Sequence, residues 1–327
     1  MGIALCLTPL TFAADLQPAI TAFNEAHYSK AKPLFEVAAK DSLTKNDALY
    51  YLGRIAFQEG DADKAKDYLE QSVGVEPNSS DEYYWLGFAY GDLAKQDSTS
   101  IFKRASYASN SHKYLQLAID INPKNIDAHR GLFWFYFSAP SIVGGGIDKA
   151  EKKLLDVRAI SPLDGDILQL SLYQGKGEKD KQLAQAKFLI TTYPNSAEAL
   201  FQAAQTFRNN QKLDSAITGF ELASKLPITP QNRMFVEASI FQFGETCQWA
   251  NVRLGDAIAS VEKYIAINAE VKNAEVNLPR WTLAKLYYQK GDMEKYQSLR
   301  EQLDPAFIKQ KWVKDDIERF DKQDKKS

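Results

Sequence analysis

The sequence predicts an all-α protein made of stacked pairs of antiparallel helices. The stretch Asn46–Ser79 shows this most clearly, because its apolar residues recur at helical spacing over Asp47–Gln58 and again over Asp63–Val75. Gly60 supplies a turn between the two helices, and Pro77 ends the second one. No segment of the chain has a pattern that predicts a β-strand. A helix pair of this size cannot bury its apolar face alone, so it has to stack on similar neighbours.

Composition excludes several classes of function. Hydrophobic residues make up 45% of the 327, which is enough for a buried core. The 42 acidic residues nearly balance the 40 basic ones, so no charge surplus points to nucleic acid or to an anionic membrane. No apolar run reaches the roughly 18 residues of a transmembrane helix. We therefore expect no nucleic-acid partner and no membrane span in the body of the chain.

The first 13 residues resemble the end of a secretory signal peptide with a truncated start. Gly2–Phe12 is apolar and lacks the usual basic residues, and a small-x-small pattern ends at Ala13. The alternative is the start of an ordinary apolar helix. Leu5 stands before Cys6 where a lipid-attachment motif needs a small residue, so we expect no lipid anchor. Export, to the periplasm or beyond, would leave Cys247 as the only cysteine and would exclude an intramolecular disulfide.

The opening unit recurs along the chain with a period of about 34 residues. Small or aromatic residues return at fixed positions, most clearly in Leu200–Leu226 and Leu278–Pro305. This pattern resembles the tetratricopeptide-repeat (TPR) family, and the resemblance covers nearly all of residues 14–305. It implies a right-handed α-α superhelix, a solenoid of about seven to eight helix pairs. The first helix of each pair would line a concave groove.

Several units depart from the regular pattern. Extra residues interrupt the third unit near 96–110, where we expect an additional helical turn or two, and the fourth near 139–147. The fifth unit, 165–194, is the weakest, and its first helix is predicted to be short. Tyr296 replaces a small residue in the eighth unit, which predicts looser packing there. Residues 306–321 predict an amphipathic capping helix, and 322–327 a frayed tail.

The sequence offers no catalytic or metal-binding constellation. His27, His112 and His129 lack partners at ligand spacing, so we interpret them as core or rim residues. Cys247 has no histidine nearby and is expected to be a packed thiol. The run Gly144-Gly145-Gly146 follows a helix and lacks the lysine and hydroxyl residue of a phosphate loop, so it predicts a surface turn. We expect no enzyme activity, no cofactor and no metal.

Transferring the groove register of the family onto this chain gives a set of aromatic, arginine and amide side chains, a composition typical of peptide interfaces. Some of these aromatics could equally pack between helices. Three scattered arginines make a clamp for C-terminal carboxylates doubtful. The predicted groove residues are Tyr50, Arg54, Phe57, Tyr84, Phe88, Arg130, Trp134, Phe137, Phe201, Gln205, Arg208, Asn209, Trp281, Lys285 and Tyr288. The candidate residues in the inserted segments are Phe102, Lys103, Arg104, Tyr107, Gly144, Gly145 and Gly146.

The pattern favours a non-catalytic adaptor of the bacterial cell envelope whose groove holds a segment of a partner protein. An alternative is a small-ligand-binding accessory of a transport system. The run FYFSAPSIVGGG, following the insertion near 96–110, is similar to TPR proteins associated with TRAP-type transporters. That resemblance implies an apolar cavity beside Phe102, Tyr107, Trp134 and Phe137. An enzyme subunit of cell-wall metabolism is a third hypothesis, for which the spacing of titratable residues offers no support.

Overall fold

The computed structural model describes residues 15–75, 79–97, 99–268 and 276–324. All regular structure in this part of the chain is helical. The predicted signal peptide, residues 1–13, and the last residues of the predicted tail lie outside the described residues. None of the described helices is long and apolar enough to cross a membrane. In chain order the helices are α1 Gln17–Asn24, α2 Tyr28–Ala38, α3 Lys45–Gln58, α4 Ala62–Val75, α5 Ser80–Lys95, α6 Ile101–Ile121, α7 Ile126–Ser138, the 3-10 helix η1 Ser141–Val143, α8 Ile147–Ile160, α9 Pro162–Gly175, α10 Lys179–Thr192, α11 Ala197–Asn209, α12 Leu213–Ser224, α13 Arg233–Ala250, α14 Leu254–Ile267, α15 Asn277–Lys290, α16 Met293–Glu301, α17 Pro305–Ile308 and α18 Lys311–Asp324.

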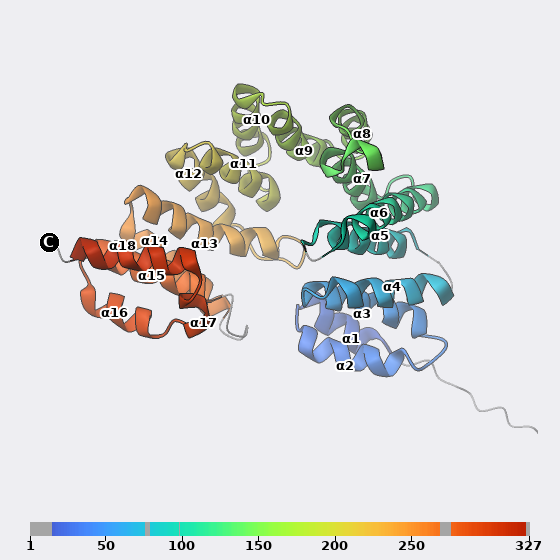
Figure 1. The fold of residues 1–327 in the computed structure, drawn as a ribbon, viewed down its shortest axis with the longest axis horizontal. Helices are drawn as coiled ribbons and strands as arrows, with labels where there is room; N and C mark the ends of the chain where they lie inside the picture. The colour runs from blue at the N-terminus through green and yellow to red at the C-terminus, as the bar shows by residue number, and fades with distance from the viewer. Residues whose placement is uncertain (1–14, 76–78, 98, 269–275, 325–327) are drawn as a thin grey trace, which may run out of the picture. The chain divides into compact units, whose positions relative to one another are not determined.

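The chain divides into two compact units, residues 1–177 and 178–327. Unit 1 contains α1 to α9, drawn in blue to green in Figure 1, and unit 2 contains α10 to α18, drawn in yellow-green to red. Within each unit, helices that follow one another in sequence pack against each other. Each pair of helices also contacts the next pair, as α3 contacts α5 and α5 contacts α7. The predicted all-α fold of repeated helix pairs is confirmed.

The regular repeat forms because small residues let its two helices approach closely. A Cβ atom on Gly53 of α3 would lie 2.6 Å from Leu69 Cγ of α4, a distance that real Cβ atoms do not show. Gly60 has φ +78°, a left-handed conformation that ends α3 and that side chains with a Cβ rarely adopt. Helix α3 begins two residues before its predicted start, and α4 begins one residue before its own.

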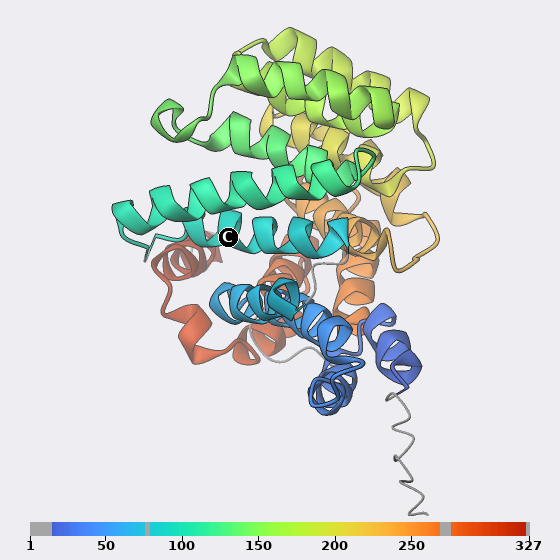
Figure 2. The same ribbon diagram turned by 90° about the vertical axis from the view of Figure 1, so that its right-hand side faces the viewer.

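The two interrupted units contain the structural elements that distinguish unit 1. The insertion near 96–110 lengthens α6 to 21 residues, against 14 in α4, so the predicted additional turns are confirmed. The second insertion forms η1 and a glycine turn. A Cβ atom on Gly145 would lie only 1.7 Å from the Ala139 carbonyl oxygen, and the Gly146 N–H donates to the Tyr136 carbonyl at 2.7 Å. Figure 2 shows the start of α6 and the η1 turn on the same side of unit 1.

Three expectations about the regular units are corrected. The first helix of the fifth unit, α9, is not short but has 14 residues, and Ser161 caps it by accepting from the Asp164 N–H. Tyr296 is not loosely packed: 1% of it is exposed, because the C-terminal helices cover it. The predicted cap is two helices, α17 and α18, and α18 reaches Asp324, three residues beyond the predicted end at 321.

Candidate binding groove and apolar pocket

The first helices of unit 1 share a layer of aromatic side chains. Phe57 of α3 lies against Trp85 and Phe88 of α5, with ring centroids 6.0 and 4.9 Å apart. Tyr84 lies 5.9 Å from Phe88 on the same helix. Phe88 is 37% exposed, and Trp134 on α7 is 39% exposed. These helices therefore present large aromatic surfaces that the chain itself covers only in part.

Arg54 lies in the middle of the aromatic side chains at the start of this layer. Its guanidinium carbon is 4.6 Å from the Phe23 ring centroid and 4.9 Å from that of Trp85. One guanidinium nitrogen donates to the Tyr50 hydroxyl at 3.2 Å. Burial raises the pKa of Tyr50 to about 12, and burial also raises the pKa of Tyr84, so both phenols stay neutral. The Arg54 guanidinium thus makes cation–π contacts with the surrounding rings.

The three groove arginines have different partners. Arg130 forms an ion pair with Asp164 at the start of α9. Arg208, in unit 2, forms one with Glu245 at 2.9 Å. Arg54 forms no ion pair with any residue in the described part of the chain, and its buried Nε has no hydrogen-bond partner there. Among the three groove arginines, Arg54 is thus the one without a carboxylate partner in the described structure.

Helices α5, α6 and α7, together with η1, line a partly open pocket of about 770 Å³. One face of α6 lines it, with residues at spacings of three and four: Ile101, Arg104, Ala105, Ala108, Ser111 and Leu115. The other walls consist of Phe88, Gly91, Asp92, Ala94, Lys95, Gly131, Trp134, Phe135, Ser138, Ala139, Pro140, Ile142 and Val143. Space remains because small side chains on α6 face glycine and alanine positions on α5 and α7. The volume lies in the range of ligand sites, roughly 300–1,000 Å³.

A close helix crossing forms the inner end of the pocket. A Cβ atom on Gly131 would lie 2.7 Å from Leu115 Cδ2, and one on Gly91 would lie 3.0 Å from Ser111 Oγ. These glycines bring α5 and α7 against α6 at this end. The first turns of α6 and the η1 turn, by contrast, diverge enough to leave the volume between them. The pocket is therefore a consequence of the two insertions.

The predicted residues of the inserted segments are divided between several environments. Arg104 lines the pocket, and its guanidinium donates to the carbonyls of Thr99 and Gln96 at 2.8 and 2.9 Å, which holds the preceding loop. Phe102 is 85% exposed and lies outside the pocket lining, as does the exposed Lys103. Tyr107 contacts Tyr90 at 5.7 Å. Gly144, Gly145 and Gly146 shape the η1 turn.

The resemblance implied an enclosed cavity; the pocket found here is partly open to solvent, and only one of the four predicted neighbours lines it. Trp134 is a wall, whereas Phe137 stacks on Phe133 at 5.9 Å, away from the lining. The small residues Ala105, Ala108 and Gly131 were not predicted as lining residues, because the prediction considered only aromatic side chains and not the space that small side chains leave. Their helical spacing was the available signal.

In unit 2, the predicted groove residues of α11 mostly have partners within the chain. Phe201 packs against Phe220 and Phe235, both at 5.8 Å. Arg208 lies 5.0 Å from the ring centroid of Trp249, in addition to its ion pair. Gln205 is half-buried, and Asn209 is exposed. Burial raises the pKa of Glu245 against the opposing effect of Arg208, so this pair is a shielded structural contact.

The predicted groove residues of α15 are covered by the C-terminal helix, which corrects the expectation of an open surface there. Trp281 is fully buried, and its indole N–H donates to Asp316 of α18 at 2.9 Å. Lys285 is 9% exposed and binds the same carboxylate at 3.2 Å. Tyr288 is half-buried against Phe320, with ring centroids 5.1 Å apart. The amphipathic α18 covers these side chains because it needs an apolar partner for Val313 and Ile317 and their neighbours.

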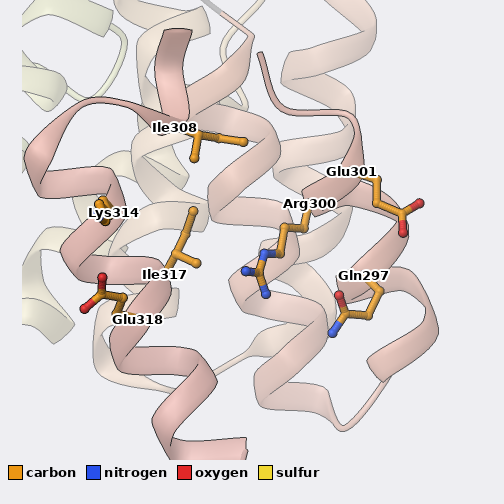
Figure 3. A pocket seen from close by; sticks show the side chains of 7 residues that line it. All are labelled: Gln297, Arg300, Glu301, Ile308, Lys314, Ile317 and Glu318. Carbon is orange, nitrogen blue, oxygen red and sulfur yellow. The ribbon is translucent and has the colours of Figure 1, made fainter. Parts of the chain in front are cut away.

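Two of the titratable residues singled out in the sequence, His129 and Cys247, are packed. His129 is 6% exposed and its Nε2 lies 3.1 Å from the Pro123 carbonyl oxygen. Cys247 is fully buried, which raises the pKa of its thiol to about 11. In the described ranges, no three His, Cys, Asp or Glu side chains gather as a metal site would require. A second, smaller hollow between α16 and α18 is rimmed by charged and amide side chains such as Arg300 and Glu318 (Figure 3).

Repeated helix pairs with partly exposed first helices define a helical repeat protein with the tetratricopeptide-repeat fold. Residues 47–79 match the family model described as tetratricopeptide repeat. No curated protein is detectably similar to the chain in sequence.

Solved structures extend the likeness over the whole fold. Yeast Tom70 is 15% identical, with a TM-score of 0.68 over 99% of this chain and 67% of its own. A thermophilic TPR protein of Thermus thermophilus is 24% identical, with a TM-score of 0.50 over 59% of this chain and 97% of its own. A TPR protein of Parabacteroides merdae is 12% identical, with a TM-score of 0.51 over 83% of this chain and 96% of its own. These matches support the fold; the expected export and the expected link to transporters stay predictions.

Proposed function

We propose that the protein is a non-catalytic scaffold that binds a segment of a partner protein along α3, α5 and α7 of unit 1. The observation that carries this proposal is the partly exposed aromatic layer in which Phe88 and Trp134 remain open to solvent. Repeat solenoids characteristically bind through such extended surfaces. Large aromatic side chains also supply most of the binding energy in protein interfaces.

The side chains of this layer indicate the chemistry of the partner segment. Its apolar or aromatic residues would pack on Phe57, Phe88 and Trp134. A carboxylate, from an acidic side chain or a chain terminus, would pair with Arg54, which already has its guanidinium oriented by Tyr50 and the neighbouring rings. The proposal assigns no catalytic step to the chain and no nucleic acid to the groove.

Selection of binding peptides from a random display library tests the proposal directly. We expect the purified chain to enrich short peptides with aromatic residues and an acidic group. Trp134→Ala or Phe88→Ala should weaken an enriched peptide by about tenfold or more, the size of effect expected for an interface hot spot. Leu155→Ala, which truncates a 62% exposed side chain on α8, is the matched control and should leave affinity unchanged.

Two results would count against the proposal that this groove binds a peptide. One is a failure to enrich any sequence motif. The other is enrichment of peptides that bind Trp134→Ala, Phe88→Ala and Leu155→Ala equally well. Arg54→Gln separates the two parts of the proposal, because it should weaken acidic peptides and leave amidated, neutral versions little changed.

We further propose that this scaffold works in the bacterial cell envelope. The support is the apolar run with a small-x-small end at Ala13. Expression of the chain with a C-terminal tag, followed by cell fractionation and N-terminal sequencing, tests this. A mature product that begins at Ala14 outside the cytoplasm is the expected result, and an uncut chain retained in the cytoplasm would refute it.

A further inference from the structure

We propose that the pocket between α5, α6, α7 and η1 binds the acyl chain of a long-chain amphiphile with an anionic head group. Its volume of about 770 Å³ is that of a ligand site rather than a packing defect. The pocket shares Phe88 and Trp134 with the proposed peptide groove, and the peptide proposal uses none of its other lining residues. It stands or falls independently of the peptide.

The lining of the pocket favours a hydrocarbon chain over a polar ligand. Apart from three charged side chains, the only hydroxyl groups in the lining are those of Ser111 and Ser138. Ser138 already donates to the Trp134 carbonyl at 2.7 Å. A sugar, a nucleotide or a peptide backbone placed here would leave donors and acceptors unsatisfied, at a cost of several kcal/mol by desolvation. An acyl chain has no such groups.

The small residues of α6 make room for a chain of this kind. Ala105 and Ala108 lie one turn apart on the lining face, and Gly131 fixes the inner end against Leu115. The lining thus follows one face of α6 from Ile101 to Leu115. At the outer end, Ile101 is 77% exposed and Ile142 is 91% exposed. Both are lining residues, so a bound chain would cover apolar surface that otherwise faces water.

The charged residues of the lining favour an anionic head group. The charged side chains of the lining are Lys95, Arg104 and Asp92, and Arg104 also pairs with Asp97 at 3.5 Å. The Arg104 guanidinium is held in place by the Thr99 and Gln96 carbonyls. Lys95 is exposed and forms no ion pair with any described residue. A carboxylate or phosphate at the rim would therefore pair with Lys95 while the chain lies inside.

Displacement of 11-(dansylamino)undecanoate from the full chain provides the test. This probe should bind with a fluorescence increase, and the saturated fatty acids from octanoate to stearate should displace it. Each added CH2 should tighten binding by about fourfold until the pocket is filled, after which affinity should level off. Vesicles of phosphatidylglycerol are tested beside free palmitate, and the more effective of the two identifies the source of the chain.

Pocket-filling variants make the test specific. Ala108→Phe and, separately, Ala105→Phe should abolish probe binding, since a phenyl ring would occupy the space. Ser106→Phe adds the same ring to an exposed position on the same helix outside the lining and should bind as the wild type does. Lys95→Gln should weaken palmitate by about two- to fivefold and hexadecanol not at all. Circular dichroism confirms that each variant is folded.

Three outcomes would overturn the proposal: no binding of probe, palmitate or vesicles; affinity that does not depend on chain length; or binding that Ala105→Phe and Ser106→Phe affect equally. Displacement of the probe by a groove-binding peptide together with no response to fatty acids would assign the pocket to the peptide instead. The first three outcomes do not bear on whether Arg54 and its neighbours bind a peptide, so the two proposals can fail separately.

Discussion

The indole N–H of Trp281 in α15 donates to the Asp316 carboxylate in α18 at 2.9 Å, and the Lys285 ammonium binds the same oxygen at 3.2 Å. The Lys285 and Asp316 side chains are only 11% and 14% exposed. Around them, Phe320 and its apolar neighbours on α18 complete a core cluster with α15 and α16. The last helix is therefore fastened to the array both by apolar burial and by a shielded charge.

This relationship predicts that Asp316→Ala destabilises unit 2 strongly. Removal of the carboxylate leaves the Lys285 ammonium and the indole N–H without their partner in a shielded site, which should lower the free energy of unfolding by about 2–4 kcal/mol. Urea denaturation of wild type and variant measures it. Asp315→Ala removes an exposed carboxylate one residue away and should change stability by less than about 0.5 kcal/mol. Equal effects of the two substitutions would show that the contact is unimportant.

The tight packing of the η1 turn leads us to expect that one added methyl group, at Gly145, lowers the stability of the protein. A Cβ atom on Gly145 would lie 1.7 Å from the Ala139 carbonyl oxygen, so Gly145→Ala must displace the turn. We expect a loss of about 1–3 kcal/mol, typical of an overpacked site. Gly74→Ala in α4 is the control from the same unit, since its Cβ atom would meet nothing within 4 Å. Thermal unfolding should show a lower transition for the first variant and an unchanged or higher one for the second.

His112 predicts a dependence of stability on pH. Burial lowers the pKa of His112 in the folded protein, and Lys149 and Lys153 lower it further. The unfolded chain, with an ordinary histidine pKa of about 6.5, therefore takes up this proton first as the pH falls. Stability should decrease with falling pH from about 6.5 down to the lower folded-state pKa.

Substitution of His112 by Gln tests this sign. Gln can keep a hydrogen bond to the Tyr136 hydroxyl, which now lies 3.0 Å from His112 Nε2. His112→Gln should lose less stability than the wild type between about pH 7 and pH 5.5 in urea titrations. His27→Gln, at a half-exposed site before α2, is the control. A wild-type slope retained by His112→Gln would contradict the prediction.

We expect the thiol of Cys247 to react only after the protein unfolds. It is fully buried in α13, and burial raises its pKa to about 11, so the thiolate is both inaccessible and scarce at neutral pH. In a Cys6→Ser chain, Ellman's reagent should react with the native protein far more slowly than with the protein in urea. Native-state reaction at the rate of a free thiol would show that this helix opens readily.

Local sequence signals were enough to predict most of the helix pairs. Apolar periodicity and helix-ending glycines such as Gly60 are local signals that extend over one or two helical turns. They can therefore be recognised without knowing which other helices pack nearby. The same reasoning failed for α9, where it predicted a short helix, and for Tyr296, where a bulky residue at a small position suggested loose packing. Contacts with the C-terminal helices decided the packing of Tyr296, whereas α9 begins at Pro162 behind a local cap by Ser161.

Residues far apart in sequence decided the candidate site. Trp281 and Phe88 both belong to the predicted groove positions, yet α18 buries the first and nothing in the described structure fully covers the second. The sequence by itself determined an all-α repeat array, because helix formation and pairing depend on local periodicity. Only the tertiary structure showed which first helices stay open and where Ala105, Ala108 and Gly131 leave a pocket. Such a volume depends on the packing of three helices at once, and no single segment encodes it.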